Sequence, residues 1–207
     1  MSKIFFAVGT SMDGFIAGLH GGPKNPLGDG GTAIHKWLYQ QKAFHELLGL
    51  GKGGETGKDN DLLKEIINRT GASIMGKRMF DEGEANWPEN APFHTPVYVL
   101  TKEVREPWVR TGGTTFYFIN DGIESALQKA RQAAGNKDIR LAGGANTIQQ
   151  FLNAGLVDDF TINYSPVMLG KGVRLFDNIE KNKFDIEIVE VINSALTSHL
   201  RYRLKNK

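Results

Sequence analysis

The chain has 207 residues, 40% of them hydrophobic and 23% charged, which is ordinary for a folded globular protein and excludes a disordered one. The formal net charge is only +2 and the Lys and Arg residues are scattered, so we expect no nucleic-acid partner. The absence of cysteine excludes disulfides, thiol nucleophiles and cysteine-ligated zinc, and we expect no metal site.

The first predicted element is an apolar strand over Lys3 to Thr10. Its apolar run, Ile4 to Val8, is too short for a signal peptide or a membrane span, so we expect a cytoplasmic protein with no membrane partner. The elements that follow are a turn at 11–14, a glycine-rich loop over 18–31, a helix over 34–48, a second glycine-rich loop over 49–57 and a helix over 61–69. Asp59 and Asn60 are expected to cap that last helix.

The second half of the chain continues the alternation of strands and helices. Its predicted elements are strands over 72–75, 96–100 and 115–119, a helix that starts at Lys77, a helix that runs from an Asp121 cap to Ala134 before Gly135, a strand starting at 139, a helix over 146–153, a long strand over 159–169 broken at Pro166, and a hairpin of 184–192 with 196–204. This order predicts an α/β fold with a mostly parallel sheet and an antiparallel C-terminal hairpin, in a single domain over residues 1–207.

Two turns in the sequence carry the pattern of a phosphate site. Gly143-Gly144 and Gly76 each follow a predicted strand and lead directly into a helix. Glycines there let a ligand approach the backbone, and the first N–H groups of the helix point at an anion. Such turns lie at the carboxyl ends of the strands, where α/β sheets bind ligands, so two of them indicate a ligand with more than one phosphate.

Other motifs do not hold. Gly49 to Gly54 matches G-x-G-x-x-G, but it follows a helix and not a strand. Gly57-Lys58 lacks the first glycine and the Ser or Thr of a P-loop, and no G-x-S-x-G elbow occurs. Among the scattered histidines only His35, beside the first glycine-rich loop, is given a functional weight.

Taken together, five segments in collinear order carry a family resemblance that covers Ile4 to about Leu204. The segments 11–17, 74–79, 99–102 and 142–147 resemble the dihydrofolate reductase-like fold, with its three layers. The segment 166–172, with Leu175-Phe176 after it, resembles the branch that contains the reductase domain of bacterial riboflavin biosynthesis. The resemblance implies an NADPH-dependent reductase, and relatives that pair through their sheets and late strands imply a homodimer.

The resemblance also implies which residues hold the cofactor. Gly143 and Gly144 would bind the pyrophosphate, and Lys77 and Arg78, with Thr101 and Lys102, would surround the 2′-phosphate. Cations in a first helical turn oppose the helix dipole, so an anionic partner is expected for them. The expected cofactor residues are Thr10, Ile16, Ala17, Gly76, Lys77, Arg78, Thr101, Lys102, Gly143, Gly144, Ala145, Asn146 and Thr147.

On the substrate side, Asp13 is the candidate catalytic residue, either as a hydrogen-bond partner of a substrate hydroxyl or as a proton donor. An ordinary tight turn at Asp13-Gly14 is an equally weighted reading. The expected substrate-binding residues are Asp13, His35, Pro166, Leu169 and Gly170.

We expect hydride transfer to a C=N or C=O carbon, of the 5-amino-6-(5-phosphoribosylamino)uracil reductase type. A dihydrofolate, pterin or other small carbonyl or imine substrate is one alternative. It is weakened because the helix that is acidic in dihydrofolate reductases begins here with Ile34-His35-Lys36-Trp37. A nucleotide-binding protein without turnover is the other alternative.

Overall fold

The computed structural model describes residues 2–180 and 184–206. Its strands are β1 (Ile4–Ser11), β2 (Phe15–Ala17), β3 (Thr70–Gly76), β4 (Pro96–Leu100), β5 (Trp108–Val109), β6 (Thr115–Ile119), β7 (Asp138–Gly143), β8 (Asp159–Ser165), β9 (Val173–Arg174), β10 (Phe184–Asn193) and β11 (Ser198–Asn206). Its helices are α1 (Lys36–Tyr39), α2 (Lys42–Leu48), α3 (Lys58–Arg69), α4 (Lys77–Glu84), α5 (Ile123–Ala134) and α6 (Ala145–Asn153), with short 3₁₀ turns η1 (Gly31–His35) and η2 (Thr111–Gly113).

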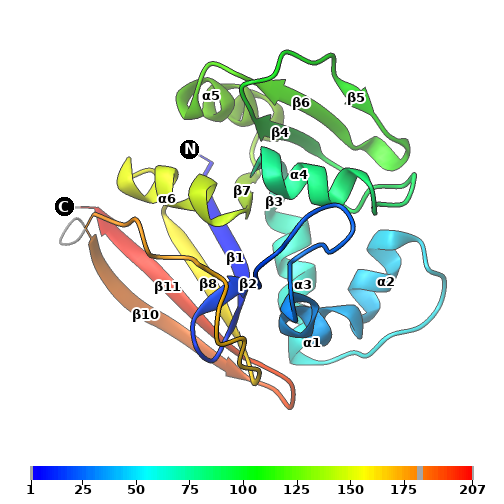
Figure 1. Cartoon of the computed structure of the whole chain (residues 1–207), viewed down its shortest axis with the longest axis vertical. Coiled ribbons are helices and arrows are strands. Elements are labelled where there is room, and N and C mark those ends of the chain that lie inside the picture. Colours follow the sequence, from blue (N-terminus) through cyan, green and yellow to red (C-terminus); the bar gives the residue numbers. More distant parts are fainter. Residues whose placement is uncertain (1, 181–183, 207) are drawn as a thin grey trace.

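Within the described ranges, nine strands form one sheet in the order β10-β11-β8-β1-β7-β3-β4-β6-β5, and β2 pairs with β9 in a small second sheet (Figure 1). The strands from β8 to β6 in this order pair in parallel. The hairpin of β10 and β11 joins β8 in the antiparallel direction. The predicted mostly parallel sheet with an antiparallel C-terminal hairpin is therefore confirmed.

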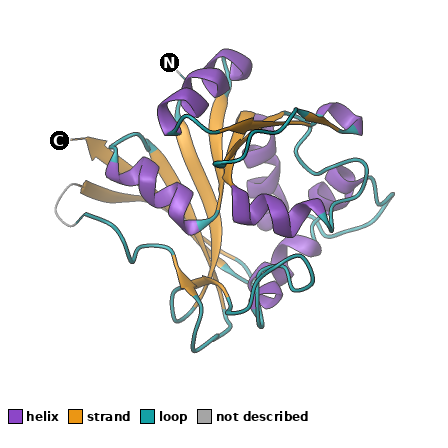
Figure 2. Cartoon of the chain, turned by 45° about the horizontal axis from the view of Figure 1, so that its top comes forward, coloured by secondary structure: helices purple, strands orange, loops and turns teal. Residues whose placement is uncertain are grey.

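Helices cover the sheet on two sides, which makes three layers (Figure 2). Alternate residues of β1 show how the strands divide: Ile4 and Phe6 belong to a large core cluster with α5 and α6, whereas Phe5 and Ala7 pack against α3. On the same side as α3, residues of β3, β4 and β6 form a third cluster with Phe80 of α4. We call these two sides the α5/α6 face and the α3/α4 face.

The predicted helix over 34–48 is broken in the structure into η1, α1 and α2. The break lies at Gln41, whose backbone is extended and forms an isolated bridge with Glu55 of the second glycine-rich loop. Lys42 donates its backbone N–H to Glu55 (2.9 Å), and the Gln41 side chain donates to the carbonyl of Trp37 (2.7 Å). These tertiary hydrogen bonds override the helical periodicity.

The predicted caps at Asp59 and Asn60 are wrong, because α3 begins earlier, at Lys58 with Gly57 as its N-cap. Both side chains are instead buried in tertiary hydrogen bonds. Asn60 Oδ1 accepts from the backbone N–H of Ala43 (2.8 Å), and Asp59 Oδ1 lies 3.0 Å from His199 Nε2.

Two further element boundaries differ from the sequence prediction. The N-cap of α5 is Gly122, which has no side-chain cap, and not Asp121. The strand predicted over 159–169 ends as β8 at Ser165, immediately before Pro166, which cannot donate to a sheet ladder. Among the described residues, no helix is long and apolar enough to cross a membrane.

Candidate functional site

The two glycine turns predicted from the sequence lie side by side at the carboxyl edge of the sheet. Their strands β3 and β7 are neighbours, with Met75 opposite Gly143. A Cβ placed on Gly76 would lie 2.6 Å from Thr147 Oγ1, and one on Gly143 would lie 3.1 Å from Met79 Sδ. The start of α4 therefore touches the turn before α6, and the start of α6 touches the turn before α4. This close approach requires glycine at Gly76.

The surface of these turns has the properties of an anion cradle. Neither α4 nor α6 has a side-chain cap at its N-terminus, so the first N–H groups of α6 are available to a ligand. The peptide bond between Gly143 and Gly144 is cis, and a Cβ on Gly144 would meet no atom within 4 Å. At the carboxyl end of the adjacent β1, the buried hydroxyl of Thr10 has no hydrogen-bond partner among the described residues. An open glycine turn beside an unpartnered hydroxyl fits the phosphate groups of a dinucleotide.

The cations Lys77 and Arg78 have acidic partners within the chain. Lys77 Nζ lies 2.6 Å from an oxygen of Asp81 and 3.2 Å from one of Glu103, and Arg78 Nε lies 3.0 Å from Glu82. The hydrogen bond to Asp81 raises the pKa of Lys77. Both cations therefore have anionic partners within the chain, and their expected contact with the 2′-phosphate stays a prediction. Their i,i+4 spacing to Asp81 and Glu82 was the sequence signal for the pairing.

The other residue pair expected near the 2′-phosphate follows β4. Thr101 Oγ1 accepts the backbone N–H of Glu103 (3.0 Å), which shapes the turn. Lys102 is exposed, and in the described part of the chain it forms no ion pair. It is therefore the cation of this group that is free to meet a ligand.

Asp13 joins the turn after β1 to the loop after β8. Its Oδ1 accepts from the backbone N–H of Leu169 (3.1 Å) and its Oδ2 from that of Gly170 (2.6 Å), while Met12 donates its N–H to the carbonyl of Val167 (2.8 Å). The structure thus brings Asp13, Leu169 and Gly170 together, as the sequence suggested.

A hydrogen bond from Ser11, together with those backbone donors, lowers the pKa of Asp13 to about 2. The carboxyl is then ionised at neutral pH, and both of its oxygens accept backbone hydrogen bonds. The lowered pKa disfavours the proton-donor role expected for Asp13, and both expected roles, proton donor or partner of a substrate hydroxyl, stay predictions.

His35 lies against β1 on the α3/α4 face of the sheet. A Cβ on Gly9 would lie 3.3 Å from its Cε1, so the ring rests against the backbone of β1. The turn that carries it is fixed to the end of β8, because Ser165 Oγ donates to the carbonyl of Ile34 (2.5 Å) next to Pro166. Burial and the nearby charge of Arg140 lower the pKa of His35 to about 4, so the ring is neutral at pH 7.

The remaining expected residues have mixed environments. Ile16 is part-buried against the large core cluster, and Ala17 pairs with Val173 in the small sheet of β2 and β9, which the sequence analysis did not foresee. Ala145 is buried, and exposed Asn146 accepts a hydrogen bond from Gln150 Nε2 (2.7 Å) through its Oδ1.

Arg140 was missed by the sequence analysis. The signal was present, since a cation stands between the apolar residues Ile139 and Leu141 of a central strand. Strand alternation then places it on the face opposite those two side chains.

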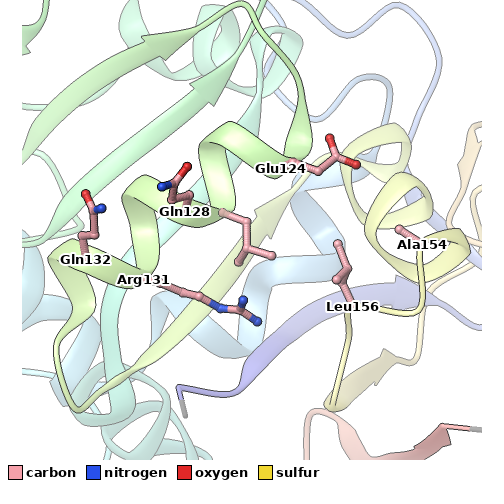
Figure 3. Close-up of a pocket in the computed structure, with 7 residues that line it drawn as sticks. Glu124, Gln128, Arg131, Gln132, Ala154 and Leu156 are labelled. Carbon is pink, nitrogen blue, oxygen red and sulfur yellow. The ribbon is translucent and has the colours of Figure 1, made fainter.

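A surface groove on the α5/α6 side lies away from this edge (Figure 3). It is lined by residues of α5 and of the segment after α6: Glu124, Leu127, Gln128, Arg131, Gln132, Ala154 and Leu156. None of the expected site residues contributes to it. Among the described residues, no group of three or more His, Asp or Glu side chains is arranged to hold a metal ion.

Known proteins similar to this chain agree with the resemblance seen in its motifs. The uncharacterized protein YyaP of Bacillus subtilis (strain 168) is 32% identical over 149 residues, which is 67% of this chain and 78% of that protein. The structure of a putative riboflavin biosynthesis protein from Shewanella sp. PV-4 has a TM-score of 0.65 at 22% identity, over 100% of both chains. Dihydrofolate reductase from Enterococcus faecalis, complexed with NADP(H), has a TM-score of 0.57 at 12% identity, over 99% of this chain and 97% of that one.

These structural similarities confirm the predicted dihydrofolate reductase-like fold. The family assignment comes from the sequence, because residues 2–201 match the RibD C-terminal domain family over nearly the whole length of the chain. The chain belongs to the RibD C-terminal domain family.

Proposed function

We propose that the protein is an NADPH-dependent reductase that transfers a hydride to a C=N or C=O carbon of a small substrate. The observation that carries the proposal is the contact between the two glycine turns, which gives one continuous site for a ligand with several phosphates. Family membership and the NADP(H) bound to the Enterococcus neighbour support the choice of cofactor. The Shewanella neighbour's description as a putative riboflavin biosynthesis protein supports a substrate from that biosynthesis, and the type we propose is the ribosylaminouracil phosphate.

In this proposal the residues of the two turns bind and orient the cofactor. Backbone N–H groups of the first turn of α6 bind the pyrophosphate, the Thr10 hydroxyl donates to a ligand oxygen, and Lys102 binds the 2′-phosphate. When bound, NADPH supplies the hydride. Asp13 holds the loop over 166–170 against the end of β1, and that loop with His35 encloses the substrate.

The test is a fluorescence titration with NADPH and NADH, which follows the chain's three Trp residues. We expect saturable binding of both, with NADPH tighter. Replacement of Lys102 with Ala should weaken NADPH by roughly tenfold, the equivalent of about 1.5 kcal/mol for one charge-assisted hydrogen bond, and should leave NADH nearly unchanged.

An absence of NADPH binding at millimolar concentration would refute the proposal. Oxidation of bound NADPH is then followed at the nicotinamide absorbance with the ribosylaminouracil phosphate, dihydrofolate and small carbonyl compounds. Turnover identifies the substrate class. Binding without oxidation across this panel would favour a nucleotide-binding protein that does not turn over.

A further inference from the structure

The apolar covering of the α3/α4 face is divided. One cluster joins Phe5 and Ala7 of β1 to α3, and the other joins β3, β4 and β6 to Phe80 of α4. Strand β7 lies between β1 and β3 in the sheet. The side chains that β7 presents to this face therefore lie between the two clusters. Ala142 packs against the second cluster, and we use the word gap for the position between the clusters that Arg140 occupies.

Arg140 is the residue that β7 directs into this gap. Its neighbours Ile139 and Leu141 are fully buried in the core of the opposite face, and its partners across the ladder are Phe5 of β1 and Ser73 of β3. Both partners are buried, so the base of the gap is closed to water at this level.

Among the described residues, none compensates the charge of Arg140. Its Nε is buried without a hydrogen-bond partner, and across residues 2–180 and 184–206 its guanidinium forms no ion pair and stacks on no ring. Two other part-buried arginines are paired with carboxylates: Arg69 binds Asp138 at 2.8 Å and Asp159 at 2.9 Å, and Arg105 binds Glu84 at 2.5 Å. Arg110, whose Nε is also unpartnered, stacks on the Trp108 ring, which Arg140 does not do on any described ring. An unpaired, partly desolvated cation is costly unless an anion joins it.

His35, the last residue of η1, lies on the same face of the sheet as Arg140. Its ring rests against Gly9, and the charge of Arg140 acts on it. The ring is neutral, so it can donate or accept one hydrogen bond without adding charge of its own. Gly9 precedes Thr10, whose hydroxyl belongs to the cofactor half of the site. Strand alternation directs the Gly9 position and the Thr10 side chain to opposite faces of the sheet, so the gap and the proposed cofactor contact are neighbours only along β1.

We propose that Arg140 binds an oxyanion of the reductase's substrate, a phosphate or a carboxylate, with His35 as a neutral hydrogen-bond partner beside it. The planar guanidinium offers two parallel N–H donors to such a group. This inference rests on the proposed reductase function. It identifies the side chain that binds the anionic group of the substrate.

The test measures binding of inorganic phosphate and of acetate to the free protein, with the ¹⁵N-labelled His35 ring as the NMR reporter. In the wild type we expect added phosphate to change the ¹⁵N chemical shifts of the His35 ring. In Arg140→Met this response should be lost, because phosphate binding is weakened by roughly tenfold or more. Arg140→Lys should retain part of the binding because it keeps the charge. Arg131→Met, which removes an equal charge from α5 on the opposite face, should behave as the wild type.

The anions separate the possible sources of the oxyanion. A stronger response to phosphate supports a phosphorylated substrate, and an equal or stronger response to acetate supports a carboxylate. The inference would be overturned if Arg140→Met bound phosphate as tightly as the wild type does. It would also be overturned if the wild-type His35 ring responded to neither anion. NADPH titration of the same variants keeps the two proposals apart, since Arg140→Met should bind NADPH as the wild type does.

Discussion

A matched pair of glycine substitutions tests the cradle at the start of α6. In Gly144→Ala the new Cβ meets no protein atom within 4 Å, and the residue has a φ of −79°, which alanine adopts without strain. In Gly76→Ala the new Cβ would lie 2.6 Å from Thr147 Oγ1, a side chain that is 2% exposed and has little room to move.

The two variants should therefore differ in stability. We expect Gly144→Ala to change the free energy of unfolding by no more than about 0.5 kcal/mol, because the methyl group points into open space. Gly76→Ala should lower it by about 1 to 3 kcal/mol, the usual cost of overpacking. Urea unfolding followed by tryptophan fluorescence measures both values.

For NADPH affinity, the variant with the larger direct effect should be Gly144→Ala, although its stability is nearly unchanged. The open space over Gly144 is the position proposed for the pyrophosphate, so its methyl group should displace the ligand from the N–H groups of α6. A loss of one or two charge-assisted hydrogen bonds, about 1.5 to 3 kcal/mol each, weakens NADPH by roughly ten- to a hundredfold or more. A fold of normal stability that binds NADPH with wild-type affinity in Gly144→Ala would refute the reasoning, and so would equal destabilisation by the two variants.

Two further predictions concern the loop after β8 and the edge of the sheet. Asp13 has a pKa lowered below its ordinary value, so its contribution is present at neutral pH and is lost as the pH falls from about 4 through its folded pKa of about 2. The protection of the Gly170 amide, which is its hydrogen-exchange rate relative to the intrinsic rate at each pH, should fall over that range, and unchanged protection would contradict the assignment. We also propose that the chain is a homodimer through β10, an edge strand on which Ile186, Ile188 and Val191 are 49%, 61% and 53% exposed. Light scattering should then give a dimer for the wild type and a monomer for Ile188→Lys, and a wild-type monomer would exclude this interface.

The strands and the glycine turns were predictable because their signals are local. The predicted strands over 96–100 and 115–119 match β4 and β6, and helix α4 begins at Lys77 as expected. Gly76 ends a strand and precedes a helix whatever the rest of the chain does. Its contact with Thr147 is different, because it depends on β3 and β7 becoming neighbours although 70 or so residues separate them.

The polar residues that the sequence placed wrongly are those with tertiary partners. Asp59 and Asn60 have the composition of a helix cap, but one meets His199 and the other meets Ala43, from distant parts of the chain. A local capping rule applies to a side chain that has no tertiary partner, and here folding gives both side chains such a partner. Arg140 is the reverse case: the sequence shows a cation between two apolar strand residues, but that it has no partner became visible only once its neighbours in the sheet were known.

The two halves of the site are therefore built in different ways. The cofactor half consists of backbone and small side chains at two strand ends, so any large residue at Gly76 disturbs the packing itself. The proposed substrate half consists of side chains from separate segments, with Asp13 in the turn after β1, His35 in η1 and Arg140 in β7. A substitution of Arg140 or His35 leaves the sheet hydrogen bonds intact, so the substrate can change while the fold and the phosphate cradle persist. Because the two halves can change independently, proteins of 12% to 22% identity can share this fold. The unpaired Arg140 is therefore more informative about this chain's own substrate than the shared fold is.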